Sequence, residues 1–126
     1  MTIHLDTSVV IDAITGPRRA LPAIRTAGEA GHRLTLSPIA LFEWLRGPRA
    51  INELRDQGLM FPDAGVAPFG VDAARIAAQI YRTLKRPRSR EIDIAIAACA
   101  IEHGAVLWTL NRGDFDDIPG LTLYRG

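Results

Sequence analysis

Four acidic residues of this chain, Asp6, Glu43, Asp93 and Asp114, each lie in or beside an otherwise apolar stretch. An ionised carboxylate in apolar surroundings costs free energy unless it is paired or bound to a metal ion. Hard divalent cations such as Mg²⁺ and Mn²⁺ take carboxylate oxygens as ligands, and they usually keep several waters and a substrate phosphate as well. The four residues therefore predict a site for Mg²⁺ or Mn²⁺.

Strand and helix signals alternate along the sequence, and they determine where these acids lie. Ser37 followed by Pro38 is typical of a helix start, and the segment 91–103 is apolar on nearly all sides, as in a central helix that others cover. Gly58 is expected to end a helix. Strands are expected at 2–5, 33–36, 106–109 and 121–124, and helices at about 7–14, 17–31, 38–46, 49–57, 71–84 and 91–103.

This alternation predicts an α/β fold of three layers, in which helices cover both faces of a central, mostly parallel sheet of four to five strands. In such sheets, ligands bind beyond the carboxyl ends of the strands. Asp6 ends the first strand, Asp114 follows the 106–109 strand, and Asp93 lies in the first turn of a helix, where the dipole favours a negative group. Glu43 has to reach in from the side of its own helix. All four can therefore converge at one edge of the sheet.

Length and composition limit the class of protein. The 126 residues predict a single domain, residues 1–126, and 48% hydrophobic residues are enough to build a core. The net charge of +1 does not by itself indicate a nucleic-acid-binding protein. The single cysteine, Cys99, excludes an internal disulfide and fits a reducing compartment. No signal segment or membrane-spanning run is recognised, so we expect a cytoplasmic protein without a membrane partner.

Four segments together carry a resemblance to a known family. They are His4–Asp12, Leu41–Gly47, Asp93–Ala98, and Leu107–Phe115 with the following Ile118–Leu121. In order and spacing they resemble the motifs of PIN-domain toxins of the VapC type, and they span the whole chain. The resemblance implies an α/β/α sandwich, Mg²⁺ or Mn²⁺ as cofactor, endoribonuclease activity and a cognate VapB-type antitoxin. It carries over Asp6, Glu43, Asp93 and Asp114 as the catalytic, metal-binding acids.

Each of these acids also has a simpler interpretation. Asp6 can be a helix N-cap, Glu43 can pair with Arg46 or Arg49 on its helix surface, and Asp93 can be a first-turn residue that the helix dipole favours. Four further polar residues could orient water or a ligand around the site, although capping is an alternative for the first two: Thr7, Ser8, Asn111 and Asp116. Since some family members have an acid at the place of Asn111, Asn111 and Asp114 are alternatives for completing the site.

The densest positive cluster of the sequence lies just before Asp93. It consists of Arg82, Lys85, Arg86, Arg88 and Arg90. A carboxylate cluster repels phosphate, so a nuclease needs nearby cations to hold the RNA backbone. This loop is therefore predicted to bind RNA, the alternative being a solvated turn. The arginines at the two Gly-Pro-Arg turns, Arg18, Arg19, Arg46 and Arg49, are weaker candidates for the same track.

The predicted reaction is hydrolysis of an RNA phosphodiester bond by a water that one or two divalent ions activate. Two alternatives belong to other classes of protein. One is a non-catalytic module of the same fold that binds RNA or protein, which the presence of all four acids disfavours. The other is an aspartyl-nucleophile phosphohydrolase, which requires a second Asp two residues after the first, where this chain has Ser8.

A toxin of this kind must be silenced in the cell that makes it, and the helix around Glu43 offers a docking surface. Phe42, Trp44 and Leu45 are spread around the helix axis, so that at least one of them should be partly exposed beside the acids. Exposed aromatic residues next to a charged cleft are typical interface anchors. We therefore predict a homodimer that binds its antitoxin through this helix, with Trp44 as the residue to test.

Overall fold

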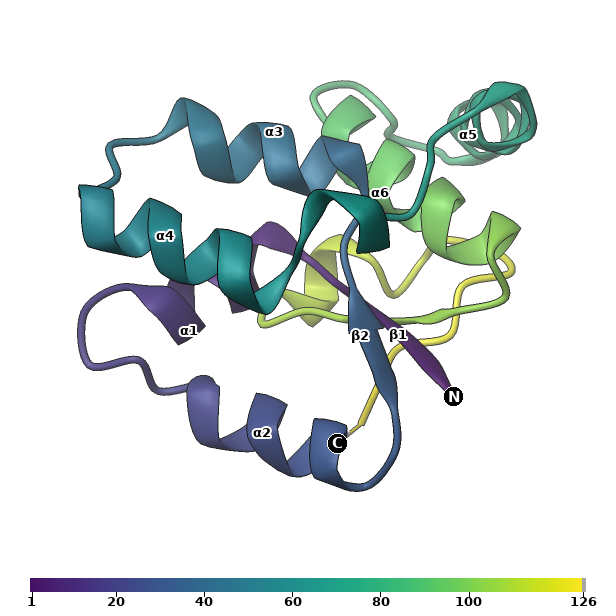
Figure 1. Ribbon diagram of the computed structural model, residues 1–126. Coiled ribbons are helices and arrows are strands. Elements are labelled where there is room, and N and C mark those ends of the chain that lie inside the picture. The colour runs from purple at the N-terminus through teal and green to yellow at the C-terminus, as the bar shows by residue number, and fades with distance from the viewer. Residues whose placement is uncertain (126) are drawn as a thin grey trace.

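The computed structural model describes residues 1–125, in which short strands alternate with helices (Figure 1). The strands are β1 (Thr2–Leu5), β2 (Arg33–Thr35) and β3 (Val106–Trp108). The helices are α1 (Thr7–Ile14), α2 (Leu21–Glu29), α3 (Pro38–Arg46), α4 (Ile51–Met60), α5 (Val71–Thr83) and α6 (Glu91–Glu102), with 3₁₀ turns at Asp63–Gly65 and Arg112–Asp114.

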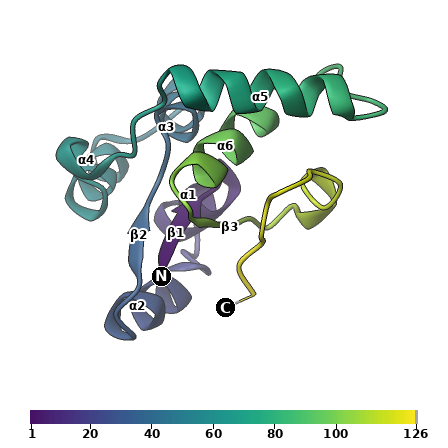
Figure 2. The same ribbon diagram turned by 90° about the vertical axis from the view of Figure 1, so that its right-hand side faces the viewer.

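The three strands form one parallel sheet in the order β2-β1-β3, with β1 in the centre. Helices lie on both sides of this sheet: α5 and α6 on one side and α2 on the other (Figure 2). The α/β fold with helices on both faces of a parallel sheet is thereby confirmed. It follows from the chain itself, since a parallel connection needs a crossover, and here each crossover contains helices.

The core is built around α6 and β1. Ile3 and Leu5 of β1 are fully buried, and six residues of α6 between Ile94 and Ala100 are buried as well. Helix α5 packs across α6 and covers it (Figures 1 and 2). The predicted central, covered helix is confirmed. Cys99 is part of this core, and burial raises the pKa of its thiol to about 11, so it is unreactive.

The expected fourth strand does not form as such in the described residues. The segment 121–124 meets β3 at a single bridge, Leu107–Leu123. Leu107 accounts for both backbone hydrogen bonds, since its N–H donates to Thr122 at 2.9 Å and its carbonyl accepts from Tyr124 at 2.7 Å. The chain turns at Gly120 (φ +82°) and then approaches β3. It pairs only with the middle residue of this three-residue strand. The sheet therefore has three strands and one bridge instead of four to five strands.

The described helices are all short. None of them within residues 1–125 is long and apolar enough to span a bilayer.

Candidate active site

The register of the sheet brings Asp6 to Thr109. Leu5 of β1 pairs with Trp108 of β3, so the next residue of each strand lies at the same carboxyl edge. The Asp6 amide donates to the Trp108 carbonyl at 2.9 Å, and the Thr109 hydroxyl donates to Asp6 Oδ2 at 2.8 Å. Both side chains are buried. Thr109 was not among the predicted site residues; its position directly after a strand is the signal that could have identified it.

Ser8 also donates a hydrogen bond to the Asp6 carboxylate. Its hydroxyl donates to Asp6 Oδ2 at 2.8 Å and accepts from the Leu110 amide at 3.1 Å. Asp6 occupies the N-cap position of α1, but within residues 1–125 its carboxylate makes no capping hydrogen bond. The capping interpretation of Asp6 therefore describes its place in the chain and not what its side chain contacts. Thr7 and Ser8 lie inside α1, and their hydroxyls donate to Glu43 and Asp6, so the capping alternative is wrong for both.

Glu43 reaches the site from α3, with Thr7 beside it. The Thr7 hydroxyl donates to Glu43 Oε1 at 2.7 Å, and Arg46 lies 3.3 Å from Oε2. The alternative pairing with Arg46 is thus present, yet it uses one oxygen only. Arg49, the other predicted partner, stacks on Trp44 instead, with its guanidinium carbon 4.1 Å from the ring centre. Helix α3 itself begins as predicted, because Ser37 Oγ accepts from the Ala40 amide at 3.1 Å.

The charges of the other three acids affect the pKa of Asp93. Its pKa is raised from 3.8 to about 6, first by burial and then by the charges of Asp6, Asp114 and Glu43, in that order. The nearby Arg90 acts in the opposite direction. Like charges disfavour each other's ionised form only over short distances. The charges of the other three acids therefore act on Asp93, and Asp93 and Asp114 line one cavity.

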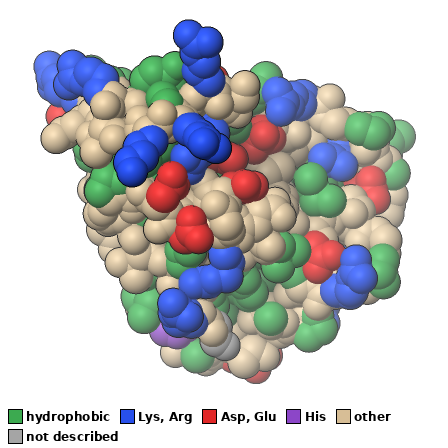
Figure 3. Space-filling view, turned by 180° about the vertical axis from the view of Figure 1, so that it is seen from behind, with side chains coloured by type: hydrophobic (Ala, Val, Ile, Leu, Met, Phe, Trp, Pro, Cys, Tyr) green, Lys and Arg blue, Asp and Glu red, His purple; other side chains and the backbone are tan. Residues whose placement is uncertain are grey.

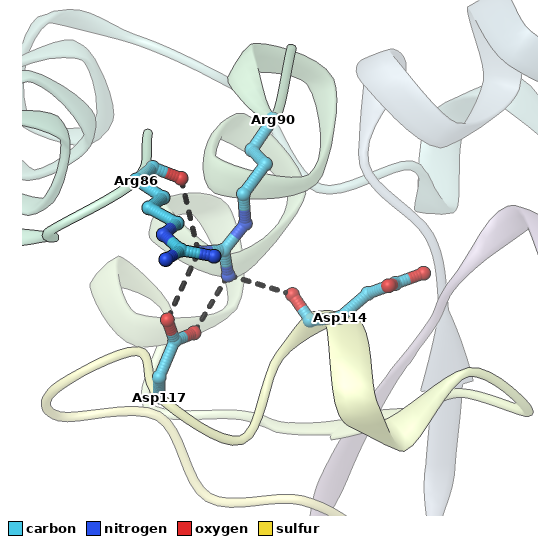
Figure 4. A network of polar contacts seen from close by, with 4 residues as sticks. All are labelled: Arg86, Arg90, Asp114 and Asp117. Carbon is cyan, nitrogen blue, oxygen red and sulfur yellow. Dashed lines mark hydrogen bonds and ion pairs between the residues drawn. The ribbon is translucent and has the colours of Figure 1, made fainter. Parts of the chain in front are cut away.

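Asp114 lies at the end of the second 3₁₀ turn and is held through its backbone. Arg90 Nη2 donates to the Asp114 carbonyl at 3.0 Å, and the same guanidinium holds Asp117 at 2.6 and 2.9 Å (Figure 4). Asn111 precedes this turn, and its backbone N–H donates to Thr109 Oγ1 at 3.0 Å. Asp117 was not predicted as part of the site, and no sequence pattern distinguishes it from Asp116.

A cavity of about 690 Å³ opens beside Asp93 and Asp114. Basic residues of the 85–90 loop form its other wall: Lys85, Arg86 and Arg90, together with Ser89. Figure 3 shows this mixture on the back of the molecule, where acidic side chains gather with arginine and lysine side chains around them. The acids could bind a cation, while the basic wall could hold the phosphates of a bound chain.

The donor set fits a divalent metal, although the acids are not assembled around one point. All four side chains offer carboxylate oxygens, and the raised pKa of Asp93 reflects first its burial and then neighbouring negative charge, which a cation would neutralise. Within residues 1–125, however, no three acidic, histidine or cysteine side chains are close enough to share one ion. Asp6 and Glu43 are turned toward hydroxyl groups, so side-chain rotations would be needed for a common ion.

Several predicted residues lie elsewhere or are already engaged. Asp116 lines a separate hollow with Arg112 and Leu123, away from Asp93. Arg82 lines an apolar hollow between α5 and α6. Four arginines have internal partners: Arg18 with Asp56 (2.8 Å), Arg19 with Asp12 (3.4 Å), Arg46 with Glu43, and Arg49 with Trp44. Of the predicted basic cluster, Lys85 and Arg86 are the exposed members that line the cavity.

The three apolar residues around Glu43 divide between core and surface. Trp44 is fully buried, while Phe42 is 52% and Leu45 is 51% exposed. The expectation that at least one would be exposed is confirmed. Trp44 is nevertheless the wrong residue for testing an interface, because its ring belongs to the core.

Comparison with known proteins identifies the family. A model of the PIN domain matches residues 3–121. The chain belongs to the PIN-domain family. PIN-domain ribonucleases generally use a divalent metal, which agrees with the oxygen-rich donor set at the carboxyl edge of this sheet.

This PIN domain is similar to one protein named a ribonuclease and, in fold, to chains of solved complexes. Ribonuclease VapC1 of Rickettsia felis is 33% identical over an alignment of 130 positions, which covers 96% of this chain and 93% of the relative. The crystal structure of VapBC2 from Rickettsia felis, bound to a DNA fragment from its promoter, superposes with a TM-score of 0.77 at 19% identity and covers 98% of both chains. DNA-bound VapBC from Salmonella typhimurium gives a TM-score of 0.76 at 24% identity over 98% of this chain and 97% of the other.

Proposed function

We propose that this PIN domain is a metal-dependent endoribonuclease that acts as the toxin of a VapBC-type toxin–antitoxin pair. The observation that carries the proposal is the cavity that Asp93 and Asp114 share with Lys85 and Arg86, where burial and the charges of the other three acids raise the pKa of Asp93 to about 6. Holding Asp93 ionised in these surroundings costs the fold stability at neutral pH. Perturbed carboxylates in a cavity are typical of catalytic sites. The kinship with a protein named ribonuclease VapC1 supports RNA as the substrate.

The proposed roles follow from the contacts of each acid. Asp6, Asp93 and Asp114 would hold Mg²⁺ or Mn²⁺, with Glu43 reaching in from α3. A cation held by these residues would supply a water of lowered pKa and positive charge for the phosphate. Thr109 and Ser8 both donate to Oδ2 of Asp6 and so orient this carboxylate. Thr7 orients Glu43 in the same way.

Phosphohydrolase chemistry is less well supported than hydrolysis of RNA. The position that would carry a second aspartate in such enzymes is Ser8, whose hydroxyl is engaged with Asp6 and the Leu110 amide. A non-catalytic module of the PIN fold is the other alternative, and metal-dependent cleavage of RNA separates it from a nuclease.

A metal dependence is the first expected result. Cleavage of single-stranded RNA should be lost in EDTA and should return with added Mg²⁺ or Mn²⁺, because the carboxylates cannot activate water without a cation. Gel assays with the purified protein would measure this. Undiminished cleavage in EDTA would remove the metal from the proposal, and absence of cleavage with either ion would favour the non-catalytic module.

The second expected result concerns the basic wall of the cavity. Lys85→Ala with Arg86→Ala should weaken RNA binding and flatten its salt dependence, by a slope of about 0.7 for each phosphate of a single strand that the protein no longer neutralises. Metal affinity should not fall, since neither side chain offers an oxygen ligand and the loss of positive charge beside the acids favours a cation. Binding is measured by fluorescence anisotropy at several salt concentrations.

The matched control for the basic wall removes two other positive charges. Arg55→Ala with Arg75→Ala changes the net charge equally, but both arginines are exposed and lie on α4 and at the start of α5. The control should keep the parental salt slope. If both double variants behave alike, only the net charge matters and the 85–86 wall does not bind RNA.

For the antitoxin, we propose that it docks on the exposed side of α3. Phe42 and Leu45 are half exposed on the helix that carries Glu43, and Arg46 lies over the Phe42 ring at 5.3 Å. An antitoxin segment that covers these residues would also cover the acids. The solved VapBC complexes with the same fold support a partner of this kind.

Two further points stay predictions. A homodimer is expected and would be tested by light scattering at micromolar concentration. A cytoplasmic location is expected as well, because that is where a toxin of this class would meet its RNA.

A further inference from the structure

Arg90 links the two segments that carry Asp93 and Asp114. Its backbone occupies the N-cap position of α6, where its carbonyl accepts from the Ile94 amide at 2.8 Å. Asp93 therefore lies three residues along the same helical turn. The Arg90 side chain extends in the other direction, to the loop that follows β3.

The guanidinium of Arg90 is almost fully engaged there. Nη2 donates to Asp117 Oδ1 at 2.6 Å and to the Asp114 carbonyl at 3.0 Å, and Nη1 donates to Asp117 Oδ2 at 2.9 Å (Figure 4). Nη1 also lies 3.5 Å from the Arg86 carbonyl. The Arg90 side chain is only 21% exposed, whereas Asp117 is 51% exposed. A guanidinium bound in this way has little capacity left for an RNA phosphate.

We infer that Arg90 and Asp117 form a clamp that positions Asp114 opposite Asp93, and that Arg90 is a positioning residue and does not bind RNA. The inference rests on the proposed function and deepens it. The bidentate pair fixes the plane of the guanidinium, and the bond to the Asp114 carbonyl then fixes the loop. Arg90 thus joins the start of α6 to the loop that carries the fourth acid.

Variants that keep the net charge can separate the effect of the Arg90 charge from its effect on the position of Asp114. Arg90→Gln alone removes a positive charge, which by itself favours a cation, while Asp117→Asn alone leaves Arg90 uncompensated. The double variant Arg90→Gln/Asp117→Asn removes one charge of each sign. Arg90→Lys keeps both charges but loses the planar fork that reaches Asp117 and the Asp114 carbonyl together.

The experiment measures Mn²⁺ affinity of the full chain by calorimetry. Both charge-balanced variants are expected to bind Mn²⁺ about tenfold more weakly, the low end of the range for groups that orient metal ligands. Their kcat on RNA should fall, with KM and its salt dependence unchanged. Amide exchange in residues 111–118 should become faster. Melting curves verify that each variant is folded at the assay temperature.

The matched control is a second Arg–Asp pair outside the site. Arg75 and Asp72 lie 3.6 Å apart on α5, both about three-quarters exposed. Arg75→Gln/Asp72→Asn should keep parental Mn²⁺ affinity and kcat. If it weakens Mn²⁺ binding as much as the Arg90 pair does, the effect is not that of a clamp.

The Asp93→Asn variant, measured beside the Arg90 variants, separates this inference from the proposed function. If Asp93→Asn loses Mn²⁺ while both charge-balanced Arg90 variants bind as the parent does, the clamp is overturned and the metal site stands. If Asp93→Asn binds Mn²⁺ like the parent, both are overturned. Weaker RNA binding with a flatter salt slope in Arg90→Gln/Asp117→Asn would make Arg90 a phosphate-binding residue and would also overturn the clamp.

Discussion

Asp93→Asn is expected to abolish RNA cleavage while leaving the protein folded. Groups that merely orient metal ligands cost about 10- to 100-fold when removed, so loss of a proposed direct ligand should lower the cleavage rate by at least roughly 100-fold. Asp6→Asn should behave alike, because Asp6 is the most buried of the four acids. Single-turnover cleavage with Mg²⁺ or Mn²⁺ would measure the effect.

The Asp93→Asn variant should also be more stable than the parent in the metal-free form at neutral pH. The pKa of Asp93 is about 6 in the folded protein, against an ordinary value of 3.8. The native state therefore holds this proton more tightly than the unfolded chain, and the stability of the parent falls as the pH rises from about 4 to about 6. Asparagine has no proton to lose, so the variant avoids this loss.

Melting temperatures in EDTA at several pH values would test the sign. Asp93→Asn should melt above the parent at pH 7.5, and the difference should vanish near pH 4, where Asp93 is protonated in the folded protein. Asp72→Asn is the control, since Asp72 is exposed on α5 and pairs with Arg75. A parental rate of cleavage in Asp93→Asn would mean that the site is misplaced.

Trp44→Ala is expected to destabilise the fold strongly and not to report on an interface. Trp44 is the largest of the fully buried side chains, packed beneath the Arg49 guanidinium. Truncating a buried tryptophan costs about 3–5 kcal/mol, which for a chain of this size corresponds to a fall of roughly 10–20 °C in Tm. Thermal unfolding followed by circular dichroism would measure it.

Phe42→Ala on the same helix supplies the contrast. Its ring is half exposed, so the Tm should change little, while the affinity for the co-encoded antitoxin should fall if the partner covers α3. Leu45→Ala should act in the same direction. Antitoxin binding that is indifferent to both changes would exclude this face as the docking surface.

Much of the architecture could be predicted because its signals are local. The Ser37–Pro38 start of α3, the apolar α6 and the strand before Asp6 each depend on residues within a few positions of one another. Helical periodicity, caps and strand composition act over such distances. The four acids could be predicted for the same reason, since each interrupts a recognisable element at its end or in its first turns.

Local signals failed where packing decided the outcome. Gly58 was expected to end a helix, but α4 continues to Met60 and Phe61 is buried directly after it. Anchoring one buried aromatic side chain outweighs the cost of about 1 kcal/mol for a glycine inside a helix. Phe42, Trp44 and Leu45 are equally apolar in the sequence, and only the neighbours of α3 determine which of them is covered.

By itself, then, the sequence determined the order of the main elements and the parallel arrangement of the sheet, and it predicted carboxylates at the edge of that sheet. Tertiary structure alone decided which other groups surround them. Thr109 bonds to Asp6 across 103 positions of sequence, and Arg90 reaches Asp117 across 27. Such interactions depend on the register of β1 with β3 and on how the following loop folds back. No periodicity or motif encodes them, because they exist only after distant segments have packed together.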